Sequence, residues 1–202
     1  MKLYYSPAAC SLSPHIVARE AGVAVELVKV DLKTHTLADG TDYTAINPKG
    51  SVPLLELDDG DRLSEGPAIV QYLADRNPAS GLAPAAGTMP RYRLQEWLNF
   101  VTSELHKQYS PLFGASVPAE YKEAVRVRLA HRFDWLSTKL AARDYLTGAQ
   151  FTVADAYLFT VLSWNKWVGI DTARWPVLEA YVARVAARPK VQEAMQAEGL
   201  IK

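Results

Sequence analysis

Cys10, the one cysteine of the chain, is the residue best suited to nucleophilic chemistry. It follows a short apolar segment and Pro7, and it lies just before or within the first turn of a helix expected over 13–21. Unpaired N–H groups and the dipole at a helix N-terminus favour a thiolate, which lowers a cysteine pKa from about 8.5 to roughly 3.5–7.5 in known cases. A free cysteine is more commonly a small buried apolar side chain. No second cysteine is present, so disulfide chemistry here would need an external thiol.

Pro53 directly precedes a predicted strand, in the loop ahead of a hairpin. The preference for a trans bond before proline is only about 0.5–1 kcal/mol, so the bond between Val52 and Pro53 can be cis. A cis bond would turn the backbone N–H and C=O of Val52 outward, where they could pair with a peptide-like ligand. A trans turn proline with no ligand is the alternative.

Glu65, Gly66 and Pro67 open a predicted helix. A carboxylate is electrostatically favoured at a helix N-terminus, which accounts for Glu65 without any ligand. The same helix end offers free N–H groups to a ligand carboxylate, while Glu65 could hold a ligand ammonium. Both interpretations are open, and the second predicts a site for a zwitterionic amino-acid head group.

The segment Phe151-Thr152-Val153-Ala154-Asp155 predicts the start of a helix. Thr152 and Asp155 have the spacing of a capping box, in which each side chain accepts the backbone N–H of the other residue. The helix that follows is almost entirely apolar, so its end cannot rely on water. Loss of the cap should therefore cost near the top of the usual range of about 0.5–2 kcal/mol. We predict a folding role for this pair.

The elements that would position these residues fall into two groups. In the first eighty residues, strands are predicted at 2–5, 25–31, 54–57 and 62–64, and helices over 13–21 and from 67 onward. This order, β-α-β followed by a long connection and β-β-α, is typical of a small α/β layer. Gly22 and Gly60 have the positions of a helix stop and a hairpin turn.

Residues 77–90 are rich in proline and glycine and cannot continue a helix. We therefore predict a domain over 1–78, a linker over 79–90 and a second domain over 91–202. In the second domain, apolar residues recur at helical spacing over 91–113, 120–142, 176–187 and 191–197. The nearly apolar segment 153–168 indicates a buried helix. The predicted fold class is an α/β domain followed by an all-α domain.

Composition excludes several classes of protein. The 202 residues include 22 Lys and Arg against 22 Asp and Glu, so the basic excess of a nucleic-acid-binding protein is missing. The balanced charge also gives no reason to expect an anionic membrane surface as a partner. Prolines interrupt the N-terminus where a signal peptide needs an apolar run, and the most apolar stretch, 156–164, is far below the ~20 residues that span a bilayer. We expect a cytoplasmic protein without a metal site, because the histidines are scattered.

Taken together in this order, Cys10, Val52-Pro53, Glu65-Gly66 and the capping box resemble the glutathione transferases, and most closely the bacterial beta class. The resemblance covers essentially all 202 residues. It implies a thioredoxin-like N-terminal domain that binds glutathione and an all-helical domain with an electrophile site and dimer contacts. It also implies that the Val52–Pro53 bond is cis, that the Val52 backbone pairs with the cysteinyl part of glutathione, and that Glu65 and Gly66 hold its γ-glutamyl end.

The resemblance also assigns residues around the glutathione sulfur. Beta-class members place a cysteine near that sulfur, which corresponds to Cys10, and a histidine followed by a lysine on the first helix of the second domain. These correspond to His106 and Lys107. A histidine near neutrality can accept a thiol proton or stabilise a thiolate. Ser103 or Glu104 would reach the glutathione of the neighbouring subunit in a homodimer.

Other transferase classes activate glutathione with a tyrosine or serine hydroxyl in this region, so Tyr5 and Ser11 are rival or auxiliary donors. Related proteins often carry lysine at the position of His35, where it would meet the glycine carboxylate of glutathione. A neutral imidazole would bind that carboxylate less strongly. His15 and His131 lie on predicted helices without evident partners, and we expect both on the solvated surface.

The implied function is transfer of glutathione to an apolar electrophile, with the thiolate as nucleophile. Tyr109, Phe113 and Trp164 are candidates for an apolar wall around the second substrate, although aromatic residues at helical spacing commonly belong to the core. One alternative is a glutathione-dependent thiol–disulfide oxidoreductase that forms a mixed disulfide at Cys10. Another is a non-catalytic interaction module, because a fold does not determine a function.

Overall fold

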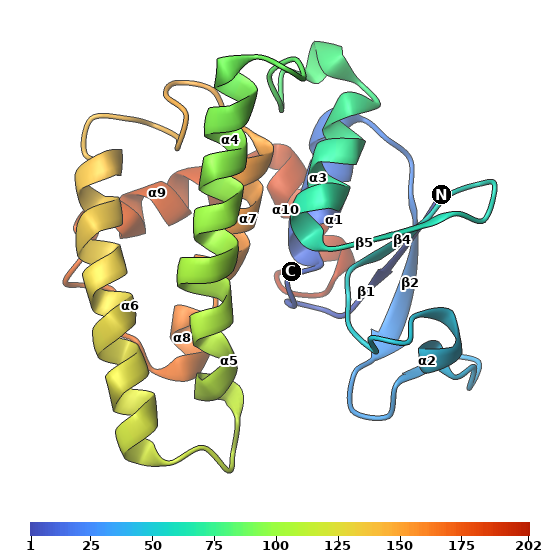
Figure 1. Cartoon of the computed structure of the whole chain (residues 1–202), viewed down its shortest axis with the longest axis horizontal. Coiled ribbons are helices and arrows are strands. Elements are labelled where there is room, and N and C mark those ends of the chain that lie inside the picture. Colours follow the sequence, from blue (N-terminus) through green and yellow to red (C-terminus); the bar gives the residue numbers. More distant parts are fainter. The chain divides into compact units, whose positions relative to one another are not determined.

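The computed structural model describes all of residues 1–202, which divide into two compact units (Figure 1). Unit 1 comprises Met1–Ala83 together with Arg188–Lys202, and unit 2 comprises Pro84–Ala187. The sequence had placed all of 91–202 in one helical domain. The structure instead includes the last helix, α10 (Pro189–Ala197), in unit 1, because α10 packs on α1 (Leu12–Ala21).

Unit 1 is built on a five-stranded mixed sheet with the strand order β3-β2-β1-β4-β5. The strands are β1 (Lys2–Tyr5), β2 (Glu26–Asp31), β3 (Thr36–Leu37), β4 (Leu54–Glu56) and β5 (Arg62–Ser64). β1 and β2 are parallel, as a helical crossover through α1 requires, and the other pairs are antiparallel. Four of these strands were predicted to within a residue or so. β3 lies in the long connection, where the sequence predicted no strand.

The remaining helical elements of unit 1 are α2 (Tyr43–Ile46), α3 (Gly66–Asp75) and the short 3₁₀ helix η1 (Pro78–Ser80). α1 packs against both α3 and α10. It ends at Gly22, which has a φ of 66° in the left-handed region that favours glycine, as predicted. The Arg188 guanidinium, at the start of α10, donates to both Glu20 carboxylate oxygens at 2.7 and 2.8 Å. α10 is therefore attached to α1 by an ion pair as well as by packing.

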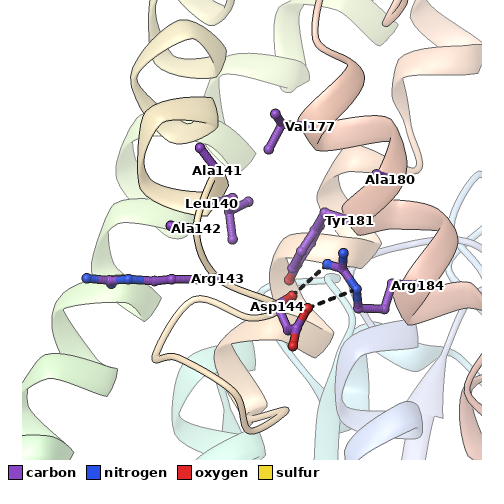
Figure 2. A pocket seen from close by; sticks show the side chains of 9 residues that line it. All are labelled: Leu140, Ala141, Ala142, Arg143, Asp144, Val177, Ala180, Tyr181 and Arg184. Atoms are coloured by element: carbon purple, nitrogen blue, oxygen red, sulfur yellow. Dashed lines mark hydrogen bonds and ion pairs between the residues drawn. The ribbon is translucent and has the colours of Figure 1, made fainter.

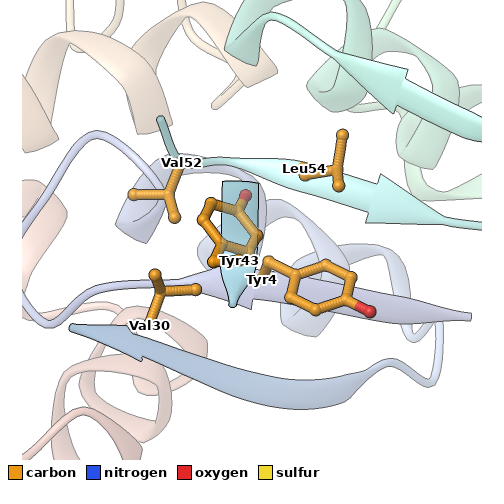
Figure 3. Close-up of a cluster of buried hydrophobic side chains, with 5 residues drawn as sticks. All are labelled: Tyr4, Val30, Tyr43, Val52 and Leu54. Carbon is orange, nitrogen blue, oxygen red and sulfur yellow. The ribbon is translucent and has the colours of Figure 1, made fainter. Parts of the chain in front are cut away.

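Successive side chains of β1 point to opposite faces of the sheet. The Tyr4 ring lies 5.5 Å from the ring of Tyr43 in α2, whereas the Tyr5 ring lies 6.4 Å from that of His15 in α1. β1 is buried on both faces as a result. Figure 3 shows the buried cluster on the α2 face, which consists of Tyr4, Val30, Tyr43, Val52 and Leu54. This cluster holds the loop before β4 against the sheet.

Unit 2 contains only helices and connecting loops. Its elements are α4 (Met89–Phe100), the π-helix η2 (Val101–His106), α5 (Lys107–Phe113), α6 (Ala119–Leu140), α7 (Val153–Leu162), α8 (Asn165–Val168) and α9 (Pro176–Ala186). The helix predicted over 91–113 runs from α4 into α5 (Figure 1), and the residues between them, η2, form a π-helix. The one predicted over 153–168 is divided into α7 and α8. Every residue of α7 is buried, as its apolar composition predicted.

The mixed sheet with its helices and the all-helical unit confirm the predicted fold class of an α/β domain combined with an all-α domain. None of the helices is both long enough and apolar enough to cross a membrane. His, Cys, Asp and Glu side chains nowhere gather in groups of three or more that could hold a metal ion.

Candidate active site

Cys10 lies in the loop between β1 and α1, one residue before the N-cap Ser11. This is the position that the sequence predicted for it. The side chain is half-buried, and its Sγ–H donates to the carbonyl oxygen of Val52 at 3.2 Å. Two residues earlier, Ala8 adopts a φ of 62°. A non-glycine residue is strained in that region and stays there only where the surrounding structure holds it.

The Ser11 hydroxyl is fully buried and bonds within the same loop. It accepts the Ser6 N–H at 3.1 Å and donates to the Ser6 carbonyl at 3.2 Å. A serine hydroxyl has one proton to donate, so Ser11 has none left for a bound thiolate while this bond is made. The geometry therefore favours a loop-forming role for Ser11 over direct activation of a thiol.

Tyr5, the last residue of β1, is buried. Burial and, to a smaller extent, the Glu198 carboxylate raise the pKa of Tyr5 above its ordinary value of 10. The phenol is therefore protonated at neutral pH. Any help that Tyr5 gives to a bound thiolate would come from donating its O–H, since a phenolate base is not available.

The loop before β4 presents Val52, and the Val52–Pro53 bond is cis, as the resemblance implied. The preceding carbonyl, that of Ser51, accepts the Tyr43 hydroxyl at 2.9 Å and the Asn47 amide at 2.7 Å, which fixes the loop. The Val52 side chain packs in the cluster of Figure 3. Its N–H makes none of the loop hydrogen bonds. A rigid backbone donor is therefore available to a peptide-like ligand beside the cysteine.

Glu65 is the N-cap of α3 and has a φ of 70°. Its exposed carboxylate accepts the Lys49 ammonium at 2.9 Å. Its carbonyl accepts the helical N–H groups of Ala68 and Ile69, and Pro67 has no N–H, so Gly66 supplies the first-turn donor for a ligand. A carboxylate acceptor and a backbone donor thus lie next to each other. Lys49 could not be predicted as a partner of Glu65, because nothing in its sequence context connects it to the start of α3.

His35 has a φ of 55°, and its Nδ1 is buried without a hydrogen-bond partner. Its ring lies over Gly50, where a Cβ atom would be 3.0 Å from the His35 Cε1. Gly50 also has a φ of 62°, so glycine is required there for both space and conformation. Nε2 is the ring nitrogen through which His35 could meet a ligand carboxylate. That role stays a prediction.

In unit 2, the π-helix η2 ends at His106. The half-buried imidazole has its Nδ1 2.6 Å from the Tyr157 hydroxyl of α7, and its ring packs edge-on against Trp164 with centroids 4.9 Å apart. π-helical turns are frequent at functional sites. The contacts with Tyr157 and Trp164 fix the orientation of the His106 ring within unit 2. Tyr157 could not be predicted as the partner of His106, because it lies 51 positions further along the chain.

The other positions assigned to glutathione on this helical segment are nearer to solvent. Ser103 is exposed and donates to the Asn99 carbonyl at 3.0 Å, and Lys107 is exposed. Glu104 accepts the Arg132 guanidinium at 2.6 Å. Glu104 therefore has a partner in its own chain, and the glutathione roles of these residues stay predictions.

Trp164 is the centre of an aromatic group in unit 2. Its ring lies edge-on to those of Tyr109 and Phe113, at 5.5 and 6.0 Å. Tyr109 is fully buried and donates to the Asn165 side chain at 2.6 Å, and burial raises its pKa. Phe113, in contrast, is 52% exposed. Of the three candidates for an apolar wall, Tyr109 and Trp164 are therefore buried in the core and Phe113 is exposed, and a substrate contact of Phe113 stays a prediction.

The capping box at the start of α7 is confirmed. The buried Asp155 carboxylate accepts the Thr152 N–H at 2.9 Å and the Thr152 hydroxyl at 2.8 Å. It also accepts the Leu146 N–H at 2.8 Å and the Tyr181 hydroxyl at 2.9 Å. Burial raises the pKa of Asp155, and these donors oppose the rise. The carboxylate thus joins α7 to α9 and to the loop before it, which is more than the box alone predicts.

The expectation that His15 lies on the solvated surface is wrong. Its side chain is fully buried, with Nδ1 2.9 Å from Oε1 of Glu198, which is equally buried. The sequence alone could not reveal this pair, because the two partners are 183 residues apart. His131 is exposed, as expected.

A cavity of about 310 Å³ lies in unit 2 beside the end of α6 and α9. Figure 2 shows Arg184 and Asp144 at its edge, where the guanidinium lies 3.5 Å from the carboxylate and donates to the Asp144 carbonyl at 2.9 Å. None of the predicted site residues lines it. Its other polar side chains also have partners within unit 2, since Arg143 donates to the Leu146 carbonyl at 3.5 Å and Tyr181 donates to the Asp155 carboxylate at 2.9 Å.

Comparison with known proteins gives the chain a family. Residues 8–76 match the model of the glutathione S-transferase N-terminal domain, and residues 97–189 match that of the glutathione S-transferase C-terminal domain. Glutathione S-transferase GstA of Escherichia coli O157:H7 is 47% identical over 200 residues, which cover 99% of this chain and 100% of the relative.

Solved structures agree with this match. A sphingomonad glutathione S-transferase complexed with glutathione is 49% identical, with a TM-score of 0.95 over 100% of both chains. A bacterial beta class glutathione S-transferase of Sphingomonas chungbukensis is 46% identical, with a TM-score of 0.96 over 100% of both chains. Both family domains are present in the expected order, and the chain belongs to the glutathione S-transferase family, with bacterial beta-class enzymes among its structural neighbours.

Proposed function

We propose that this chain binds glutathione through unit 1 and transfers it to an apolar electrophile. One observation carries the proposal furthest. The Val52 backbone is held rigidly beside a cysteine, with the Cys10 thiol 3.2 Å from the Val52 carbonyl and the Val52 N–H available to a peptide. Family membership supports the same activity, since relatives of similar length are glutathione S-transferases.

The proposed binding mode uses the chemistry of each part of the tripeptide. The cysteinyl residue of glutathione pairs with the Val52 backbone. Its γ-glutamyl ammonium binds the Glu65 carboxylate, and the adjoining carboxylate receives the Gly66 N–H at the positive end of α3. His35 is the proposed partner of the glycine carboxylate.

The proposed chemical step is attack by the glutathione thiolate. The thiol gives its proton to His106, whose ring orientation is fixed by Tyr157 at 2.6 Å and by Trp164. A hydroxyl donor such as Tyr5 stabilises the sulfur anion, which attacks the electrophilic carbon and displaces the leaving group. Holding both reactants in place adds to the rate, because it converts an encounter in solution into a reaction within one complex.

Redox chemistry at Cys10 is a second candidate, which the position of its sulfur beside the glutathione-binding backbone favours. In that reaction the Cys10 thiolate attacks a glutathione mixed disulfide and releases one thiol. The resulting mixed disulfide on Cys10 is then attacked by a second glutathione, which regenerates the thiol and forms glutathione disulfide. No second cysteine of the chain is needed.

Replacing Cys10 by Ala separates the two reactions. Glutathione conjugation to an aryl halide is expected to fall by less than about tenfold, because one contact to the sulfur is worth about 1 kcal/mol. Reduction of a glutathione mixed disulfide is expected to disappear, because its attacking sulfur is gone. The Cys10→Ser variant, which keeps a hydrogen-bond donor towards Val52, is the matched control. A thousandfold fall in conjugation by Cys10→Ala would show instead that Cys10 activates the thiol.

The same proposal includes a homodimer in the cytoplasm. The resemblance implies that helices of the second domain form the dimer interface, where Ser103 or Glu104 would approach the neighbouring glutathione. A reducing compartment keeps both glutathione and a lone cysteine as thiols, which this chemistry requires.

A further inference from the structure

The segment that follows α10 reaches the loop that carries Cys10. Glu198, the C-cap of α10, is fully buried, and its two carboxylate oxygens have different partners. Oε1 lies 2.9 Å from the His15 Nδ1 of α1, and Oε2 accepts the backbone N–H of Ala8 at 3.0 Å. The last contact joins residues 190 positions apart. The C-terminal segment is thus bonded directly to the loop between β1 and α1.

The hydrogen-bond directions in this group follow from the donors. The Arg19 guanidinium can only donate, and its Nε lies 3.4 Å from the His15 Nε2, so that nitrogen accepts. The ring proton is therefore on Nδ1 and is donated to Glu198. The Glu198 carboxylate accepts two N–H groups, one on each oxygen. A buried carboxylate is expensive unless it is satisfied in this way, and a neutral amide could accept at only one of the two positions.

The bond to Ala8 is made at a strained point of the backbone. Ala8 has a φ of 62°, which an alanine adopts only where its surroundings impose it. Ala8 is two residues before Cys10, whose thiol meets the Val52 carbonyl at 3.2 Å. A relaxed Ala8 would change the direction of the chain just before the cysteine, and the sulfur would leave Val52.

We propose that Glu198 is a positioning residue for Cys10: its carboxylate, carried by the C-terminal segment and oriented by His15, holds Ala8 in its left-handed conformation and so fixes the cysteine beside Val52. The inference rests on the proposed function only in taking the place of Cys10 to matter for glutathione chemistry. The competing explanation is that Glu198 merely attaches α10 to α1, as the ion pair between Arg188 and Glu20 does at 2.7 Å.

The reactivity of Cys10 towards iodoacetamide distinguishes these explanations. The rate is measured by mass spectrometry on the full-length protein at pH 7 without glutathione. In Glu198→Gln the side-chain NH2 group faces one of the two N–H donors, so one hydrogen bond to a charged acceptor is lost. This loss raises the equilibrium constant for local opening of the loop between β1 and α1 by about tenfold. We therefore expect alkylation of Cys10 to become about tenfold faster. The matched control, Glu20→Gln, breaks the other link between α1 and α10 and is expected to change the rate less than about twofold.

An unchanged rate in Glu198→Gln, or an equal increase in Glu20→Gln, would overturn the proposal. Should Glu198→Gln fail to fold, amide hydrogen exchange of the wild-type protein gives the answer. The Ala8 amide is then expected to exchange as slowly as the amides of α1, and exchange at the rate of an unprotected amide would contradict the proposal. Neither measurement uses glutathione. The positioning role of Glu198 is therefore tested separately from glutathione binding, which a titration with the tripeptide measures.

Discussion

The Asp155→Ala variant is expected to lose about 3–5 kcal/mol of unfolding free energy, because it removes the acceptor from a fully buried group of donors. The N–H groups of Leu146 and Thr152 would lose their acceptor, and the Tyr181 hydroxyl would keep only the Asp155 backbone carbonyl, at 3.4 Å. Each unsatisfied buried donor costs about 1–3 kcal/mol, and partial relaxation limits the sum. All five tryptophans lie in unit 2, so urea unfolding followed by tryptophan fluorescence measures the loss where it occurs.

Two variants control this measurement. Asp144→Asn removes an exposed carboxylate that lies 3.5 Å from Arg184, and such a surface change is expected to stay within about 0.5 kcal/mol of wild type. Thr152→Ala removes only the hydroxyl of the capping box and should cost about 0.5–2 kcal/mol. If Asp155→Ala lowered the unfolding free energy no more than Asp144→Asn does, the claim that the Asp155 carboxylate stabilises unit 2 would be wrong.

The capping box also has an indirect bearing on function. It starts α7, which carries Tyr157, and the Tyr157 hydroxyl meets the Nδ1 of His106 at 2.6 Å. A loosened start of α7 would therefore disturb the orientation of the proposed proton acceptor. This chain of contacts lies within unit 2, and it links a folding signal in the sequence to a residue proposed for catalysis.

The Glu65→Gln variant is expected to weaken glutathione binding at least tenfold. Glutathione presents an ammonium group at its γ-glutamyl end, and a hydrogen bond to a charged partner is worth about 1.5–3 kcal/mol. Gln keeps the length of the side chain but not its charge, so the loss reports the charge itself. Isothermal titration calorimetry with glutathione measures the change in Kd.

Lys49→Gln is the matched control for Glu65→Gln. It removes the partner that lies 2.9 Å from the Glu65 carboxylate, in a pair whose side chains are both exposed. Exposed ion pairs contribute about 0–1 kcal/mol, so the Kd for glutathione should change by less than about fivefold. A Glu65→Gln protein that binds glutathione as tightly as wild type would show that Glu65 is only a helix cap.

Local signals in the sequence predicted most of the fold. The alternation of residues in β2, the glycine that ends α1 and the capping box of α7 each depend on neighbours within a few residues. They were therefore visible without a structure. The two-residue strand β3 and the four-residue helix α2 were not, because such short elements are stabilised by the rest of the sheet.

Long-range contacts could not be predicted in this way. His15 has no neighbour in sequence that marks it as buried, and its partner Glu198 is 183 residues away. The pairing of His106 with Tyr157 has the same character. The π-helix that ends at His106 interrupts the helix that the apolar spacing predicted over 91–113. Cys10, Val52 and Glu65 were named as site residues because their local context and the family resemblance agreed.

A crystal structure of the full chain with glutathione tests the central claim most directly. The account predicts that the cysteinyl backbone of the tripeptide pairs with Val52, that its γ-glutamyl end lies on Glu65 and Gly66, and that its sulfur lies against Cys10. Glutathione bound elsewhere, for example in the cavity beside Arg184, with no ligand on the Val52 backbone, would contradict it.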